Sequence, residues 1–188
     1  MGGDFAPEVV IKGAISALPE LSSSERIVLF GDEEKIKSIM SAENASISDF
    51  DIVHCSEVIE MGDNPAKNFA KKTDSSIHVG FKRLAQGEID GFSSAGNTGA
   101  MLVGAMHTIK SVPGIIRPAI ASYIPVSEEK FNLILDVGIN PDCRPDVLYQ
   151  YGILGSIYAK IVFENSNPRI GLLNIGEEEE KGNLLTKS

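Results

Sequence analysis

The sequence alternates short apolar runs with segments in which apolar residues recur at helical spacing, and this alternation constrains the fold most. The apolar runs predict strands at residues 26–30, 50–55, 89–94, 118–124, 132–137 and 169–175. The helical spacing predicts helices at about 7–18, 32–40, 74–84, 97–110 and 145–163. Several apolar runs have no polar alternation, which is typical of parallel strands buried on both faces. We therefore expect an α/β fold with a mostly parallel sheet between layers of helices.

Polar residues at the start of two predicted helices indicate N-caps. Asp32 follows the strand at 26–30 and precedes a helix whose apolar face carries Ile36 and Met40. Either Thr73 or Asp74 is expected to cap the helix at 74–84. The strands at 118–124 and 132–137 are expected to be neighbours.

Composition excludes several classes of protein. The chain has 188 residues, 43% of them hydrophobic, which is enough for one domain with a core. Its net charge is −9 and its basic residues do not form a large cluster, so nucleic acid is not an expected partner. No apolar run is long enough to cross a bilayer. Cys55 and Cys143 lie far apart, which favours two free thiols in a reducing cytoplasm.

The stretch FSSAGNTGA, residues 92–100, places small residues where a strand should give way to a helix. Three further junctions combine glycine with Asn or Asp, at residues 1–4, 136–140 and 174–183. Ligands of open α/β sheets bind at the carboxyl ends of strands, and helix N-termini attract anions. The stretch therefore predicts a phosphate-binding loop, although the spacings of a P-loop and of a dinucleotide fingerprint are both absent. Tight packing of the strand against the helix explains the glycines equally well.

Charged residues near the junctions are candidates for chemistry. Lys181 follows four glutamates, and it either belongs to a solvated loop or neutralises an anion. Asp4, Asp136 and Asp142 fit general bases, metal ligands or helix caps. The three histidines lack metal-ligand spacing. Cys143 would be a nucleophile only with a base beside it.

Taken in order, the segments along the chain resemble the bacterial phosphate acyltransferases that act on acyl-acyl carrier protein. The resemblance is carried by MGGDFAPE, EVIEMGDNPAK, KKTDSSI, SAGNTGA, GIIRPAIA, LDVGINPDCRPD, GSIYA and NPRIGLLNIGEEEEKGN. Members of that family begin with a further strand and continue well past LLTKS. We therefore expect residues 1–188 to form a single α/β domain that is incomplete at both ends relative to the family.

The resemblance implies a fold and an activity. The fold would be a Rossmann-like α/β/α sandwich, similar to isocitrate and isopropylmalate dehydrogenases and to phosphotransacetylases, in a homodimer. The activity would convert long-chain acyl-acyl carrier protein and inorganic phosphate to acyl phosphate, without a metal or cofactor. The product would feed a membrane glycerol-3-phosphate acyltransferase, so a cytoplasmic protein with possible peripheral membrane contact is implied.

Site roles follow from that implied reaction. Phosphate would be held by Ser94, Gly96, Asn97, Thr98 and Gly99. Lys181 would balance the charge of phosphate or of the oxyanion, with Asn183 and Asn174 as neutral donors. Asp4, Asp136 and Asn140 would orient the site or handle protons.

The acidic carrier protein would need a basic docking patch on this acidic chain. The candidates are Lys67, Lys71 and Lys72, with Lys82 and Arg83 nearby in sequence. The competing interpretation of these residues is a solvated helix face. Two other functions stay open, a phosphate acetyl- or butyryltransferase that uses coenzyme A thioesters, and an anion-binding or assembly module without turnover.

Overall fold

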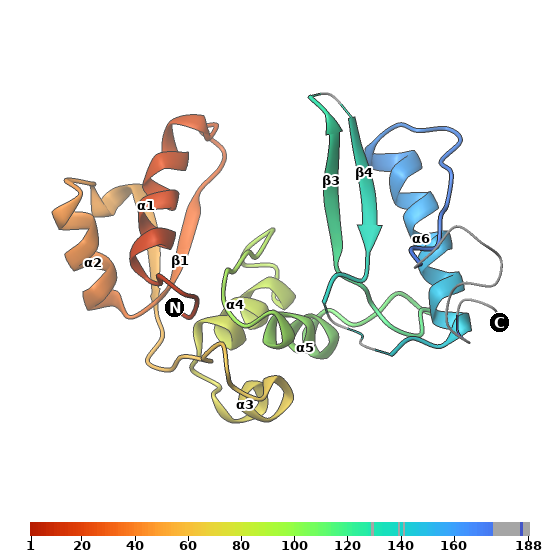
Figure 1. Cartoon of the computed structure of the whole chain (residues 1–188). Helices are drawn as coiled ribbons and strands as arrows, with labels where there is room; N and C mark the ends of the chain where they lie inside the picture. Colours follow the sequence, from red (N-terminus) through yellow and green to blue (C-terminus); the bar gives the residue numbers. More distant parts are fainter. Residues whose placement is uncertain (129, 139, 141, 175–184, 186–188) are drawn as a thin grey trace. The chain divides into compact units, whose positions relative to one another are not determined.

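The computed structural model describes residues 1–128, 130–138, 140, 142–174 and 185. The chain divides into two compact units, Met1–Lys110 and Ser111–Ser188 (Figure 1). The first unit contains two strands and five α-helices, and the second contains two strands and one α-helix among its described residues. The prediction of a single domain stays a prediction.

The first unit follows the predicted alternation of strands and helices. Its elements are α1 (Glu8–Ala17), β1 (Ile27–Gly31), α2 (Glu33–Ala42), β2 (Phe50–His54), α3 (Pro65–Lys71), α4 (Ser76–Ala85) and α5 (Thr98–Thr108). Two short 3₁₀ turns, Leu18–Glu20 and Ile47–Asp49, follow α1 and precede β2. Helix α3 was not predicted as a separate element, because its start lies within the turn-rich stretch MGDNPA.

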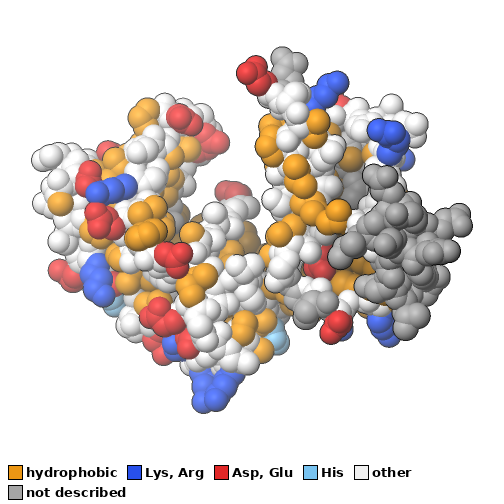
Figure 2. Space-filling model, in the orientation of Figure 1, with side chains coloured by type: hydrophobic (Ala, Val, Ile, Leu, Met, Phe, Trp, Pro, Cys, Tyr) orange, Lys and Arg blue, Asp and Glu red, His pale blue; other side chains and the backbone are white. Residues whose placement is uncertain are grey.

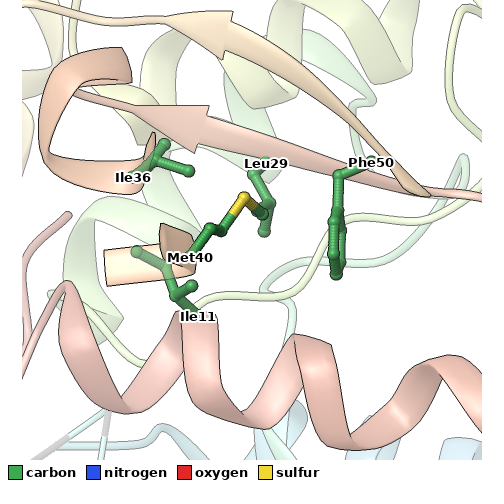
Figure 3. Packing of buried hydrophobic residues seen from close by; sticks show 5 residues of the cluster. All are labelled: Ile11, Leu29, Ile36, Met40 and Phe50. Atoms are coloured by element: carbon green, nitrogen blue, oxygen red, sulfur yellow. The ribbon is translucent and has the colours of Figure 1, made fainter. Parts of the chain in front are cut away.

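Strands β1 and β2 form the parallel pair that the sequence predicted, with Ile27 opposite Phe50 and Gly31 opposite His54. A core of apolar side chains covers one face of this pair. Its buried members are Ile11, Leu29, Ile36, Met40 and Phe50, contributed by α1, β1, α2 and β2 (Figure 3). The apolar faces of α1 and α2 are therefore held against the strands by burial.

Successive residues of a strand point to opposite faces, so the neighbour of Leu29 serves a second core. The ring of Phe30 lies 5.8 Å from that of Phe92, centroid to centroid, and Phe92 lies 5.2 Å from Phe81 of α4. Behind these rings, α3, α4 and α5 share a buried cluster. Its members are Ile59, Phe69, Ile77, Phe81 and Ala100.

The segment at 89–94 was predicted as a strand and is not one, because it forms no ladder with a neighbouring strand. Its aromatic residue, Phe92, is partly buried between Phe30 and Phe81. Apolar residues favour burial, whereas a strand also needs a paired neighbour, and the local sequence does not specify that neighbour.

The caps confirm one prediction and correct another. Asp32 caps α2, with its carboxylate 3.2 Å from the backbone nitrogen of Lys35. The cap of α4 is Ser75, whose hydroxyl accepts from the backbone of His78. Asp74 instead accepts hydrogen bonds from the backbone and hydroxyl of Ser56, which anchors the chain that leaves β2.

The second unit is a hairpin and a long helix. Strands β3 (Ala121–Ser127) and β4 (Lys130–Leu135) are neighbours, as predicted, but they pair antiparallel. Helix α6 (Pro145–Val162) packs against β4, and Leu135 contacts the position of Gly155. All of β3 is exposed, and apolar side chains gather over the hairpin (Figure 2).

The run at 169–175 was also predicted as a strand. Its described part, residues 169–174, forms no ladder, and Leu173 is 84% exposed. As at 89–94, the apolar composition alone did not supply a pairing partner.

Candidate functional site

The predicted phosphate loop packs against the N-terminal loop of the first unit. A Cβ atom on Gly3 would lie 2.9 Å from the carbonyl oxygen of Ala95, and a Cβ on Gly2 would lie 2.9 Å from that of Ile59. Both glycines also have positive φ angles, 98° at Gly2 and 123° at Gly3. Only glycine allows this conformation and this close approach together. Two of the junctions singled out in the sequence, residues 1–4 and 94–99, are thus brought together.

Asn97 is buried, with 5% of its surface exposed, and its side chain is fully engaged in hydrogen bonds. Its oxygen accepts from the backbone nitrogen of Ala100 at 2.9 Å and so caps α5. Its nitrogen lies 3.0, 3.2 and 3.1 Å from the backbone carbonyl oxygens of Glu60, Met61 and Asp63 in the preceding loop, which share its two hydrogens. This bonding favours a structural role for the Asn97 side chain over the predicted contact with phosphate.

Other donors at the start of α5 are free within the described residues. The Ser94 hydroxyl accepts from the Gly96 backbone at 3.1 Å, which leaves its own hydrogen for an external acceptor. The backbone N–H groups of Thr98 and Gly99 lie in the first helical turn, where no intrahelical acceptor exists. Ser94 and Thr98 are exposed. This terminus therefore offers hydrogen-bond donors and the positive end of a helix dipole to an anion.

A glycine in this turn also has a packing role. A Cβ on Gly99 would lie 2.5 Å from Cγ of Pro65 at the start of α3. Gly99 is therefore required by the contact between α3 and α5, whatever binds beside it. Both explanations of the glycine-rich stretch, close packing and an anion site, apply to the same few residues.

The three predicted docking lysines separate into two kinds. Lys72 is tied down, because its ammonium lies 2.7 Å from Asp63 and 2.6 Å from the Val58 carbonyl oxygen. Lys67 and Lys71 are exposed on α3 and form no ion pair with a described residue. Spaced four residues apart, they share one face of the helix.

In the second unit, two candidates from the junction at 136–140, Asp136 and Asn140, are hydrogen-bonded to each other. The Asn140 side-chain nitrogen donates to Oδ1 of Asp136 at 2.7 Å, and the Cys143 thiol lies 3.5 Å from Oδ2. Asp136 directly follows β4 and has a φ angle of 65°. Its backbone nitrogen donates to the Ile120 carbonyl at 2.8 Å, which anchors the turn. A carboxylate with both oxygens oriented is thus presented at a strand end.

Two members of this cluster were missed from the sequence. Tyr151 of α6 receives a hydrogen bond from Asn140 at 3.0 Å and donates to the Pro118 carbonyl at 3.2 Å. Burial first, and then the charge of Asp136, raise the pKa of Tyr151 to about 12, so the hydroxyl keeps its proton. Exposed Arg117 acts in the opposite direction on the pKa values of Tyr151 and Cys143. In the sequence, Tyr151 lies within the apolar pattern of the helix at 145–163 and Arg117 directly precedes the apolar run at 118–124, so neither position indicates a site.

Cys143 has an acidic neighbour, but the environment does not activate it. Burial, followed by the hydrogen bond to Asp136, raises the pKa of the thiol above its usual range. A thiol with a raised pKa is mostly protonated near neutral pH and is a poor nucleophile. In this structure the Cys143 thiol is instead a hydrogen-bond donor to Asp136.

The other predicted site residues are less informative. Asp4 and Asn174 are exposed. Lys181 and Asn183 lie outside the described residues. Within the described part of the chain, no group of His, Cys, Asp and Glu is arranged to hold a metal ion. Over the same residues, no helix has both the length and the apolar character that crossing a membrane requires.

Comparison with known proteins supports the resemblance. The family described as "Fatty acid synthesis protein" matches residues 1–188. Phosphate acyltransferases of Dictyoglomus turgidum and Acetivibrio thermocellus are each 44% identical over 187 residues, which cover 100% of this chain and 55% of theirs. That of Lysinibacillus sphaericus is 44% identical over 188 residues and is covered to 56%. The chain thus spans about half the length of the curated relatives it matches.

A solved structure supports the fold class. The EutD phosphotransacetylase from Staphylococcus aureus superposes with a TM-score of 0.54 over 83% of this chain and 50% of that one, at 18% sequence identity. The likeness, together with the parallel β1–β2 pair, confirms a Rossmann-like α/β fold. From the match along its whole length, this chain belongs to the fatty acid synthesis protein family and corresponds to the N-terminal part of its phosphate acyltransferase relatives.

Proposed function

We propose that the chain is part of an acyltransferase that converts long-chain acyl-acyl carrier protein and inorganic phosphate to acyl phosphate and free carrier protein. The observation that carries this proposal is the N-terminus of α5, where the donors of Ser94, Thr98 and Gly99 face no acceptor among the described residues. The names of the relatives add the reaction class, a phosphate acyltransferase.

Phosphate would bind at the start of α5. The Ser94 hydroxyl and the backbone N–H groups of Thr98 and Gly99 donate to its oxygens, and the helix dipole favours its negative charge. The Gly96 backbone N–H donates to the Ser94 hydroxyl, and the Asn97 side chain holds the loop through the backbone of Glu60 and Ala100. Asp4 would orient the same loop, because Gly3 beside it packs on Ala95.

In the reaction, a phosphate oxygen attacks the thioester carbonyl carbon, and the carbon–sulfur bond then breaks to release the carrier's phosphopantetheine thiolate. A thiol has an ordinary pKa of about 8.5, so this leaving group needs little acid assistance. Positioning of the two anionic reactants and stabilisation of the oxyanion are the main demands, and one oxyanion donor is typically worth about 2.7–4 kcal/mol.

The family resemblance gives further roles to residues of the second unit. Asp136 and Asn140 would handle protons or orient a reactant, because Asn140 and Cys143 hold the carboxylate in one orientation. We assign to Lys181 the charge balance of phosphate or oxyanion, with Asn183 and Asn174 as neutral donors, on the family resemblance alone.

The acidic carrier protein would dock on Lys67 and Lys71 of α3, where Lys and Arg atoms gather at that end of the first unit (Figure 2). Lys72 supports the patch from within through Asp63. A homodimer, contact with a downstream glycerol-3-phosphate acyltransferase and peripheral membrane contact belong to the same proposal through the family resemblance.

The deciding experiment measures thiol release from palmitoyl-acyl carrier protein with and without phosphate. It compares this chain with a chain that spans the full length of its relatives. Phosphate-dependent release by the longer chain is the expected result. Release only from acetyl- or butyryl-coenzyme A would replace the proposal with a short-chain phosphotransacylase, and no release from any thioester by a folded longer chain would favour a binding module.

A further inference from the structure

Tyr151 lies where three segments of the second unit meet. It stands on α6, is 4% exposed, and reaches with its hydroxyl toward the turn after β4 and the segment before β3. On one side the hydroxyl accepts from Asn140, and on the other it donates to the Pro118 carbonyl. A single buried oxygen therefore connects segments that are 33 and 11 residues away in sequence.

The orientation of Asn140 follows from these partners. An ionised carboxylate only accepts hydrogen bonds, so the Asn140 side-chain nitrogen, rather than its oxygen, must face Asp136. That nitrogen carries two hydrogens, and Asp136 and Tyr151 take both of them. Among the described residues, the oxygen of Asn140 has no donor, and we assign it to a reactant.

We propose that Tyr151 is a positioning residue, whose hydroxyl fixes the side chain of Asn140 and, through it, the carboxylate of Asp136. The role in catalysis rests on the proposed function, which places Asp136 and Asn140 in the reaction. The same hydroxyl restrains Pro118, so Tyr151 also fixes the backbone next to the exposed guanidinium of Arg117. Tyr151 itself touches no reacting atom.

A second tyrosine on α6 supplies a matched control. The hydroxyl of Tyr158 bonds to that of Tyr123 on β3, and neither contacts the Asp136 cluster. Replacing Tyr158 by Phe removes a partnered hydroxyl from the same helix. Any effect common to Tyr151→Phe and Tyr158→Phe therefore reports on stability, whereas an effect confined to Tyr151→Phe reports on positioning.

The first test uses this chain and needs no activity. Cys143 is held on Asp136, so a loosened turn frees the thiol and lowers its pKa toward the ordinary value. Alkylation of Cys143 by iodoacetamide at pH 8 is expected to be about fivefold faster in Tyr151→Phe, as the loss of a hydrogen bond to a buried group implies. Buried Cys55, whose pKa burial raises to about 11, is the internal reference. Equal Cys143 rates in wild type, Tyr151→Phe and Tyr158→Phe would overturn the proposal.

Should Tyr151→Phe fail to fold, the wild-type chain decides. The side-chain amide hydrogens of Asn140 are expected to exchange with solvent at least about tenfold more slowly than those of exposed Asn174. The reason is that both amide hydrogens of Asn140 are hydrogen-bonded. The two resonances are identified with Asn140→Asp and Asn174→Asp. Exchange at the same rate would refute the fixed orientation of Asn140.

The second test measures thioester cleavage with the longer chain. Tyr151→Phe is expected to lower kcat about tenfold while KM for palmitoyl-acyl carrier protein stays within about twofold, since positioning acts on the reacting geometry. If Tyr151→Phe has a normal kcat although its Cys143 is alkylated faster, Tyr151 has no role in the reaction. If wild type lacks phosphate-dependent cleavage, the proposed function fails, and the role of Tyr151 in catalysis fails with it. Its anchoring of the turn is still decided by the Cys143 rates and the Asn140 exchange.

Discussion

The ammonium of Lys72 lies 2.7 Å from the carboxylate of Asp63 and 2.6 Å from the carbonyl oxygen of Val58. These two bonds join the end of α3 to the loop that follows β2. Both side chains are about a quarter exposed, so the pair is partly shielded from solvent. The same loop is held by the Asn97 nitrogen at the start of α5. A residue predicted as part of a docking surface thus helps to build the loop behind the candidate anion site.

Lys72→Met should therefore lower the thermal midpoint of the chain at pH 7, while Lys71→Met, at an exposed position that has no ion pair with a described residue, should leave it nearly unchanged. The hydrogen bond from Lys72 lowers the pKa of Asp63 below its ordinary value. A lowered folded-state pKa stabilises the protein above the unfolded pKa of about 3.9, and the stabilisation disappears as the pH falls through the folded value. The difference between wild type and Lys72→Met should accordingly narrow below about pH 4, measured by thermal unfolding. A constant difference would contradict this assignment.

Asn97→Ala should destabilise the chain by about 2 kcal/mol or more, because it removes a helix cap and a donor to three backbone carbonyls. Urea unfolding measures the change. Asn64→Ala is the matched control, since Asn64 caps α3 from an exposed position and its loss should cost only about 1 kcal/mol. If the two substitutions lower the free energy of unfolding equally, the hydrogen bonds from Asn97 to the backbone of residues 60–63 contribute nothing to stability.

Gly104→Ala should destabilise the first unit by about 1–3 kcal/mol, as overpacking does. A Cβ at Gly104 would lie 2.3 Å from the ring of Phe81, so α4 and α5 would have to move apart. In contrast, Gly13 of α1 has no neighbour within 4 Å of its Cβ position. Gly13→Ala should stabilise the chain by about 0.4–1 kcal/mol by restricting the unfolded state. Opposite signs in urea unfolding are expected, and a loss of stability for both would contradict the packing argument.

Ser94→Ala in the longer chain should raise KM for phosphate by about tenfold or more, in keeping with one lost hydrogen bond to a charged ligand. Ser93→Ala, at the exposed neighbouring position, should leave KM unchanged. Initial rates at varied phosphate concentration provide the measurement. An equal KM for wild type and Ser94→Ala would remove Ser94 from the anion site.

Charge reversal at both Lys67 and Lys71 should slow association with acyl carrier protein and weaken its dependence on salt, because steering by opposite charges is lost. The control reverses Lys35 and Lys37 of α2, which gives the same change in net charge at lysines paired with Asp32 and Glu33. Stopped-flow association at low and high salt compares the two variants. Equal association rates for the two charge-reversal variants would favour the interpretation of Lys67 and Lys71 as part of a solvated helix face.

The sequence by itself determined the local elements, because helical periodicity, capping residues and apolar runs act over a few neighbours. Helices α1, α2, α4, α5 and α6 and strands β1 and β2 lie where the pattern placed them. The sequence also singled out Asp136 and Asn140, which lie four positions apart, but their hydrogen bond is a finding of the structure.

Only the tertiary structure decided which apolar runs became strands and which polar side chains were available. Phe92 of the segment 89–94 packs between Phe30 and Phe81, yet strand pairing depends on a neighbour that the local sequence does not name. Asn97, Lys72 and Tyr151 likewise found partners far along the chain, at Glu60, Val58 and Pro118. A hydrogen bond depends on where two atoms lie in space, which the local sequence does not specify. Only the folded structure therefore shows that the side chains of Asn97 and Lys72 are hydrogen-bonded and that Tyr151 bonds to the Asp136 cluster.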